Sequence, residues 1–436
     1  MAFSGRHRVP ARQRRAGPRR AGPRRAGPRR AGLRRAGLRR AAPWRSALAA
    51  GLLVAAVSVT LGVDATTAAA SSRHGVTDEL VESVLPYRGF SQAGVASVAC
   101  TSPSWCVAVG TGSVNHGSTQ LASLTGLVWT YGGREWRLSA RLPIAESSLA
   151  SVSCVSRSFC MAVGRAGNPY SRVLAVRWNG RSWSRVTAAS PPSSGNGDAL
   201  ASVDCLSRSA CWAIGGVNLG EGGALPHDLI EHWSGRAFAT VAGPSTGNAL
   251  VAIGCSSAVD CWASSYPSGA RASTNEVEHY FKGVWRRATI PLSLSGGAAW
   301  IACRTTTTCW MVGARTANGE LPASVHLAGG ACEKVTMPAP KYPDVFLQGI
   351  ACASAGDCWS VGGNTLVGPG VRPPYKEVAF AEHWGGSSWQ IATVSGAPAA
   401  RYGSLVAASC TGGGFCVAGG ETLRGAPLVA APHLLR

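Results

Sequence analysis

Residues 95–110 read VASVACTSPSWCVAVG, and six later segments of the chain repeat this pattern. The first cysteines of successive copies lie 48 to 58 residues apart, and the second cysteine always follows six positions later. Two runs of alternating apolar residues flank each cysteine pair, which predicts two short strands joined by a tight turn. The other copies are LASVSCVSRSFCMAVG (149–164), LASVDCLSRSACWAIG (200–215), LVAIGCSSAVDCWASS (250–265), AAWIACRTTTTCWMVG (298–313), LQGIACASAGDCWSVG (347–362) and LVAASCTGGGFCVAGG (405–420).

A second element, consisting of an aromatic residue, a glycine turn and another aromatic residue, recurs between the cysteine pairs. It predicts a third and a fourth strand in each unit, joined at the glycine and closed by a proline. We interpret FKGVW (281–285) as a copy one residue shorter, and 327–332 as a degenerate copy ending in Cys332. The regular copies are Tyr131 to Trp136, WNGRSW (178–183), WSGRAF (233–238) and WGGSSW (384–389).

Four strands in each unit, repeated seven times, predict an all-β fold, a seven-bladed β-propeller with four-stranded blades. A single blade cannot bury both of its faces, whereas stacking around a ring covers them. The last unit lacks a fourth strand, because only one further strand follows Cys416. Residues 79–86, ELVESVLP, precede the first unit and match the missing strand. We therefore expect the propeller to span 79–436, with 79–86 closing the last blade.

The positive charge of the chain is concentrated at its beginning. Of 42 Lys and Arg residues, 16 lie before Ser46, in a stretch without any acid, whereas residues 71–436 carry 26 basic and 20 acidic residues. Residues 1–45 repeat AGPRR and AGLRR and are expected to be disordered. Residues 46–70 contain an apolar run and end in small residues, with Ala68 and Ala70 placed for cleavage, so 1–70 predict a secretory signal. An uncleaved membrane anchor and a nucleic-acid-binding arm are the alternatives.

The C-x5-C-x-A-V-G element followed by W-x-G-x-x-W resembles the repeat of uncharacterised secreted β-propeller-like proteins of actinobacteria. The resemblance covers residues 79–436 and implies the propeller fold, without implying a particular activity. A looser similarity links the glycine turn to the Asp-box of sialidase-type propellers. No unit has the Ser-x-Asp that precedes the glycine in that box, so glycosidase chemistry is not carried over.

The fifteen cysteines form seven pairs of identical spacing plus Cys332. This regularity favours pairing within each hairpin, and export provides an oxidising compartment. Zinc is the alternative, but its ligand pairs are usually two to four residues apart and need a second pair nearby. We predict one hairpin disulfide per blade, with Cys332 as a free thiol. The predicted disulfides are Cys100–Cys106, Cys154–Cys160, Cys205–Cys211, Cys255–Cys261, Cys303–Cys309, Cys352–Cys358 and Cys410–Cys416.

Catalytic and phosphate-binding motifs such as H-E-x-x-H, G-x-S-x-G and the Walker loop are absent from the sequence. Three Glu-His pairs, Glu231-His232, Glu278-His279 and Glu382-His383, invite a metal interpretation. Because they occupy equivalent positions of separate blades, we expect solvated strand positions instead. Tryptophans that recur after the second cysteine, such as Trp212 and Trp310, are expected to pack between blades rather than to bind sugars. No catalytic residue, metal or cofactor is assigned.

The connections between the second and third strands, and those between blades, differ in length and open on one face of a propeller. The cysteine turns and glycine turns open on the other face and are nearly constant. Variable loops on a rigid scaffold are where binding residues usually lie. The candidate ligand-binding residues are the polar and aromatic side chains of these loops: His116, Asn168, Tyr170, His227, Tyr266, Arg372, Tyr375 and Tyr402.

These observations lead to a functional hypothesis with two rivals. We expect a secreted, extracellular, monomeric protein that binds a glycan or protein of the cell envelope or surroundings, without nucleic acid. It would be tethered to the membrane if its signal stays uncleaved. An extracellular glycan hydrolase or lyase on the same face is the first rival, and it would need a pair of carboxylates. A structural surface protein without a small ligand is the second.

Overall fold

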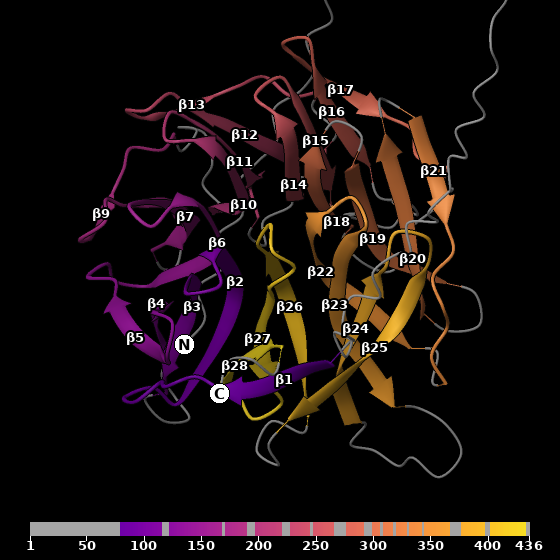
Figure 1. The fold of residues 1–436 in the computed structure, drawn as a ribbon. Coiled ribbons are helices and arrows are strands. Elements are labelled where there is room, and N and C mark those ends of the chain that lie inside the picture. Colours follow the sequence, from indigo (N-terminus) through magenta and orange to yellow (C-terminus); the bar gives the residue numbers. More distant parts are fainter. Residues whose placement is uncertain are drawn as a thin grey trace, which may run out of the picture. The chain divides into compact units, whose positions relative to one another are not determined.

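The computed structural model describes residues 79–115, 122–167, 171–189, 197–219, 227–244, 247–265, 276–291, 299–305, 308–316, 320–328, 331–341, 344–366, 376–396 and 402–432. In these residues the regular secondary structure is entirely β-strand. Figure 1 shows the strands grouped into blades around a common centre. The described residues include no helix that is long and apolar enough to span a lipid bilayer.

The first six blades each take four consecutive strands, paired antiparallel in chain order. The first contains β2 (Gln92–Ser102), β3 (Trp105–Val114), β4 (Ser123–Tyr131) and β5 (Trp136–Arg141). The second and third contain β6 (Ser147–Ser156), β7 (Phe159–Ala166), β8 (Arg172–Trp178) and β9 (Trp183–Arg185), then β10 (Asp198–Ser207), β11 (Ala210–Val217), β12 (His227–Trp233) and β13 (Phe238–Thr240). The fourth and fifth contain β14 (Leu250–Ser257), β15 (Asp260–Ser265), β16 (Val277–Phe281) and β17 (Val284–Ala288), then β18 (Trp300–Thr305), β19 (Thr308–Thr316), β20 (Glu320–Ala328) and β21 (Ala331–Val335). The sixth contains β22 (Val345–Ser354), β23 (Asp357–Leu366), β24 (Lys376–Trp384) and β25 (Trp389–Gly396).

The seventh blade joins the two ends of the described chain. It contains β26 (Gly403–Cys410), β27 (Cys416–Thr422) and β28 (Pro427–Ala431), and its outer strand is β1 (Glu79–Val84). β1 runs antiparallel to β28, with Val81 opposite Ala431 and Val84 opposite Leu428. It also pairs in parallel with β25 of the sixth blade, so these two blades share one eight-stranded sheet.

The hydrophobic core is divided into seven clusters, one at each boundary between neighbouring blades. The cluster between the second and third blades, for example, packs Met161 and Val163 against Leu200 and Trp233. A further cluster joins the seventh blade to the first, with Phe415 and Val417 contributed by the seventh. The recurring apolar residues are therefore buried by radial stacking, and the all-β, seven-bladed propeller is confirmed.

Each blade carries one disulfide across the hairpin of its first two strands, with Cα atoms 4.0–4.1 Å apart. The two cysteines face each other in the strand register, as Cys100 and Cys106 do. This confirms one hairpin disulfide per blade. Cys332 is a free thiol and pairs in register with Leu327, so it occupies the position of the second aromatic residue.

The strand register corrects two interpretations of the sequence. Tyr280 pairs with Trp285, so the aromatic pair of the fourth blade has the same spacing as the others and is not one residue shorter. Glu231, Glu278 and Glu382 are fully buried rather than solvated. They lie on third strands, whose two faces are both covered by neighbouring blades, so alternation along the strand does not imply exposure.

The antiparallel pairing defines two faces of the ring. The variable-loop face carries the connections between second and third strands and those between blades. The constant-turn face carries the cysteine turns, such as residues 157–158, and the glycine turns, such as 179–182. Tryptophans after the second cysteine lie between the blades, as predicted: Trp212 of the third blade contacts Tyr280 and Trp285 of the fourth.

Candidate functional site

Of the eight candidate binding residues, six lie outside the described residues: His116, Asn168, Tyr170, Tyr266, Arg372 and Tyr375. His227 begins β12 and is exposed, opposite Val217 in the sheet. Tyr402 precedes β26 and is half-buried. The structure does not bring these two together, since they belong to the third and seventh blades.

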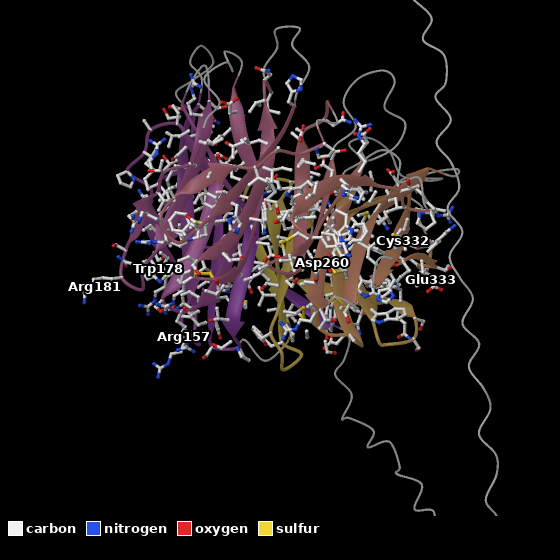
Figure 2. The ribbon with its side chains drawn as sticks, turned by 90° about the horizontal axis from the view of Figure 1, so that it is seen from above. Arg157, Trp178, Arg181, Asp260, Cys332 and Glu333 are labelled. Atoms are coloured by element: carbon white, nitrogen blue, oxygen red, sulfur yellow. A yellow bond between two sulfur atoms is a disulfide. The ribbon has the colours of Figure 1, made fainter. Side chains whose placement is uncertain are left out.

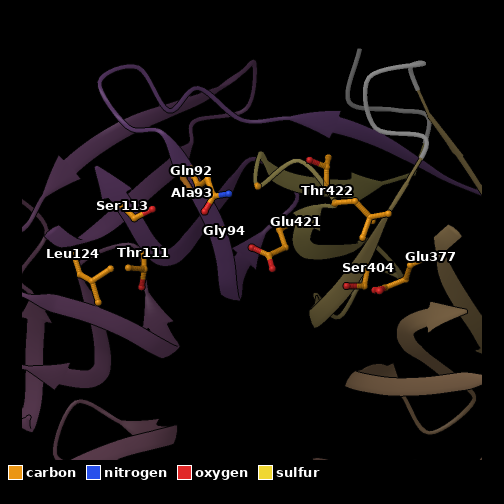
Figure 3. Close-up of a pocket in the computed structure, with 13 residues that line it drawn as sticks. Gln92, Ala93, Gly94, Thr111, Ser113, Leu124, Glu377, Ser404, Glu421 and Thr422 are labelled. Carbon is orange, nitrogen blue, oxygen red and sulfur yellow. The ribbon is translucent and has the colours of Figure 1, made fainter. Parts of the chain in front are cut away.

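A cleft of about 430 Å³ opens on the variable-loop face where the sixth, seventh and first blades meet. Its wall from the first blade includes Gln92, Thr111 and Ser113, and its wall from the seventh includes Ser404 and Glu421. Glu377, at the beginning of β24, is the contribution of the sixth blade. Figure 3 shows Glu421 between Gln92–Gly94 on one side and Ser404 with Glu377 on the other.

Local backbone structure explains how Glu421 reaches the cleft. It lies near the end of β27, where it pairs with Ser404 and Pro427. Its carboxylate lies against Gly94 of β2, at a point where a side chain at Gly94 would collide with it. The following turn is fixed by the Gly425 amide, which donates to the Thr422 carbonyl at 2.8 Å. The glycine in β2 therefore leaves the room that the carboxylate occupies.

The two carboxylates give the cleft a negative potential. Burial raises the pKa of Glu421, and the neighbouring Glu377 carboxylate raises it further. A like charge disfavours ionisation of Glu421, whereas a cation bound beside it would favour its charged form. The cleft is thus arranged to favour a ligand that carries a positive charge.

Tyr402 lies beside this cleft. Its carbonyl accepts a 2.9 Å hydrogen bond from the Leu423 amide, and Leu423 lines the cleft. The ammonium of Lys376 lies 5.3 Å from the centre of the Tyr402 ring, within the range of a cation–π contact. Of the two candidate binding residues that the structure describes, Tyr402 is the one beside this cleft.

The sequence interpretation missed Glu377 and Glu421. Both lie on strands rather than in the variable loops, since Glu377 belongs to β24 and Glu421 to β27. The sequence did contain a signal for them, because both are acidic residues at the strand ends that lie nearest the variable-loop face. Among the described residues, no group of three or more His, Cys, Asp or Glu is placed to hold a metal ion.

A second polar feature lies in the central channel near the cysteine turns. A cavity of about 250 Å³ is lined there by the residues around the first cysteine of every blade. Asp204 is the acid of this lining, and its carboxylate accepts a 2.8 Å hydrogen bond from the Cys255 amide. Burial raises the pKa of Asp204 to about 6, although backbone hydrogen bonds from Cys255 and Cys205 oppose the rise. This carboxylate joins two blades, which is a structural role.

No protein-family model matches the chain, and no curated protein matches it. Solved structures with a related fold include YCF48 bound to D1 peptide, at 15% identity over 81% of this chain and 94% of that chain, with a TM-score of 0.49. YCF48 from Cyanidioschyzon merolae is 12% identical over 80% of this chain and 98% of that chain, with a TM-score of 0.46. The WD40 β-propeller domain of Doa1 is 13% identical over 80% and 96%, with a TM-score of 0.45. At these identities and TM-scores the similarity carries no inference about ligand or activity.

The strands, their closure and the cleft define a class of protein. The chain is a seven-bladed β-propeller in which one disulfide links the first two strands of each blade.

Proposed function

We propose that this chain is an exported binding module that takes a cationic group of a protein or glycan into the cleft of the variable-loop face. The observation that carries the proposal is the convergence of Glu377 and Glu421, from two neighbouring blades, on one cleft. A protonated amine suits two close carboxylates, because its positive charge offsets their mutual repulsion and it donates up to three hydrogen bonds.

Export is part of this proposal. Its supports are the basic and apolar segments before residue 71 and the resemblance of the repeat to secreted actinobacterial proteins. The seven disulfides add a further support, because such bonds persist in oxidising compartments. A rigid ring with unequal loops on one face suits recognition of an extracellular ligand.

The proposal is tested by screening the protein against arrays of glycans and of peptides that include amino sugars and lysine-rich sequences. We expect the retained ligands to carry amines, and the double substitution Glu377→Gln with Glu421→Gln to weaken their binding by at least ~1 kcal/mol. The matched control is Glu135→Gln with Glu333→Gln, which removes the same charge from exposed positions outside the cleft. Equal losses in both variants would contradict the proposal.

A second candidate function is hydrolysis of a glycan in the same cleft. A carboxyl group with a raised pKa next to a second carboxylate is the pairing that glycosidases use as general acid and as nucleophile or base. Release of reducing sugars from a retained glycan, abolished by Glu421→Gln alone, would favour hydrolysis over binding.

A further inference from the structure

Positive charge collects on one part of the constant-turn face. The second blade, residues 147–185, contains six Arg and no Asp or Glu. We use the name basic face for five arginines in the turns of the first three blades, all of them exposed: Arg134, Arg157, Arg181, Arg208 and Arg236. Among the described residues, no carboxylate lies within 4.0 Å of any of these five guanidinium groups. Figure 2 shows Arg157 and Arg181 extending from the ribbon into solvent near Trp178.

Two of these arginines form equivalent clusters at successive blade boundaries. The Arg157 Nη2 of the second blade donates to Ser102 Oγ at 3.0 Å and to Ser104 Oγ at 2.5 Å, both in the first blade. One blade further on, Arg208 Nη2 donates in the same way to Ser156 Oγ at 3.4 Å and to Ser158 Oγ at 2.5 Å. Each cluster therefore combines a guanidinium group with two hydroxyl groups from the preceding cysteine turn.

The backbone below each cluster is held in place. Trp178 Nε1 donates to the Arg157 carbonyl at 3.0 Å, and Trp233 Nε1 donates to the Arg208 carbonyl at 3.0 Å. The turn that carries each arginine is also closed by a hairpin disulfide. A guanidinium group has five N–H donors, and only those of Nη2 are used here. The Nε and Nη1 donors have no partner among the described residues and remain available to an anion.

We propose that the basic face binds a linear polyanionic glycan, a polysaccharide with phosphate, sulfate or carboxylate groups on successive units. The two clusters repeat the same donors one blade apart, which fits a ligand whose anionic groups also repeat. The free Nε and Nη1 donors of each guanidinium group can donate hydrogen bonds to such oxyanions, and the permanent positive charge of the group adds electrostatic attraction.

The surroundings favour a glycan over a membrane surface. Each arginine donates to two serine hydroxyls, and Trp178, which packs against Trp183, lies beside Arg157; both tryptophans are partly exposed. The described turns of the first three blades on this face expose no large apolar side chain that could enter a bilayer. This site lies on the face opposite the cleft of Glu377 and Glu421, so the two proposals stand independently.

The direct test is protection of arginines from phenylglyoxal, read residue by residue by peptide mass spectrometry on the full chain. Residue-level mapping is needed because the 16 arginines before Ser46 bind polyanions themselves. Dextran sulfate should protect Arg157 and Arg208, neutral dextran should protect neither, and exposed Arg165 at the other end of the second blade should stay reactive. Protection confined to the leader arginines would overturn the proposal. Equal protection by phosphatidylglycerol vesicles would assign the surface to membranes instead.

A pair of variants makes the test quantitative. In a chain that begins at Asp78 and so lacks the leader arginines, Arg157→Ala with Arg208→Ala should weaken dextran sulfate binding about tenfold and lower the slope of log affinity against log salt by about two. Arg165→Ala with Arg185→Ala removes the same charge from second-blade positions outside the clusters, and it should leave the slope nearly unchanged. Because all four arginines are exposed, we expect both double variants to fold like the parent, and circular dichroism checks this. Equal losses in the two pairs would show a general charge effect and contradict the clusters.

Discussion

The amide of Cys100 donates a 2.9 Å hydrogen bond to Ser409 Oγ, which joins the first repeat to the last across 309 positions of sequence. The same bond recurs inside the ring, where the Cys205 amide donates to Ser153 Oγ at 3.0 Å and the Cys255 amide to Asp204 Oδ2 at 2.8 Å. At these three boundaries the residue before the first cysteine couples the inner strands of neighbouring blades. Because the boundary between the last and first blades uses the same contact as the two boundaries of the third blade, the ring closes in the same way as it stacks.

Closure by β1 predicts a large loss of stability when that strand is removed. A chain that begins at Gly89 lacks the strand between β25 and β28 and exposes both of their edges. We expect a lower thermal midpoint and a less cooperative transition than for a chain beginning at Asp78, measured by calorimetry. Superimposable transitions of the two chains would argue against closure by β1.

The free thiol predicts a single, slow labelling reaction. Burial raises the pKa of the Cys332 thiol, so the reactive thiolate is scarce at neutral pH. Without reductant we expect one labelled cysteine per chain, faster at pH 9 than at pH 7, and mapped by mass spectrometry to Cys332. The variant Cys332→Ser should take up no label. Two or more labelled cysteines would contradict the seven hairpin disulfides.

The buried glutamates predict that stability falls as pH rises. Burial raises the pKa of Glu382 from 4.5 to about 9, so the folded state holds a proton that the unfolded chain releases above pH 4.5. The protonated carboxyl group thus contributes its full stability below that value, and the contribution is lost as the pH rises through 9. Each pH unit in this range costs up to about 1.4 kcal/mol per group.

The variant Glu382→Gln keeps this position neutral at every pH. We expect its thermal midpoint to exceed that of the parent at pH 8.5, with a clearly smaller difference at pH 5. Glu333→Gln, at an exposed position, serves as the control and should show no such trend. A midpoint difference for Glu382→Gln that is the same at both pH values would mean that ionisation is not the cause.

The fold could be predicted because cysteine spacing and glycine turns repeat with the same geometry in every blade. The repeat also located the closing strand, since residues 79–86 matched the one element that was missing. Exposure was harder to predict. Glu231 and Glu382 are each followed by a histidine, and such a polar pair is typical of a strand with one face in solvent. Neighbouring blades cover both faces of a third strand, so these carboxyl groups are buried.

The cleft lies on the face for which the sequence predicts binding, whereas the residues that line it were not among the predicted ones. Tyr402 lies beside the cleft, whereas Glu377 and Glu421 were not selected because they belong to strands. What brings them together is the boundary between the sixth and seventh blades, which depends on how the ring stacks and not on spacing along the sequence. Blade-to-blade proximity of this kind is visible only in three dimensions.

The central claim is that the two faces of the ring bind different ligands. Isothermal titration of an amine ligand from the array screen and of dextran sulfate, each against two double variants of the chain that begins at Asp78 and lacks the leader arginines, tests it most directly. Glu377→Gln with Glu421→Gln should weaken binding of the amine ligand and leave binding of dextran sulfate unchanged. Arg157→Ala with Arg208→Ala should do the reverse. Loss of both ligands in one variant, or of neither ligand in either variant, would contradict the assignment of separate sites to the two faces.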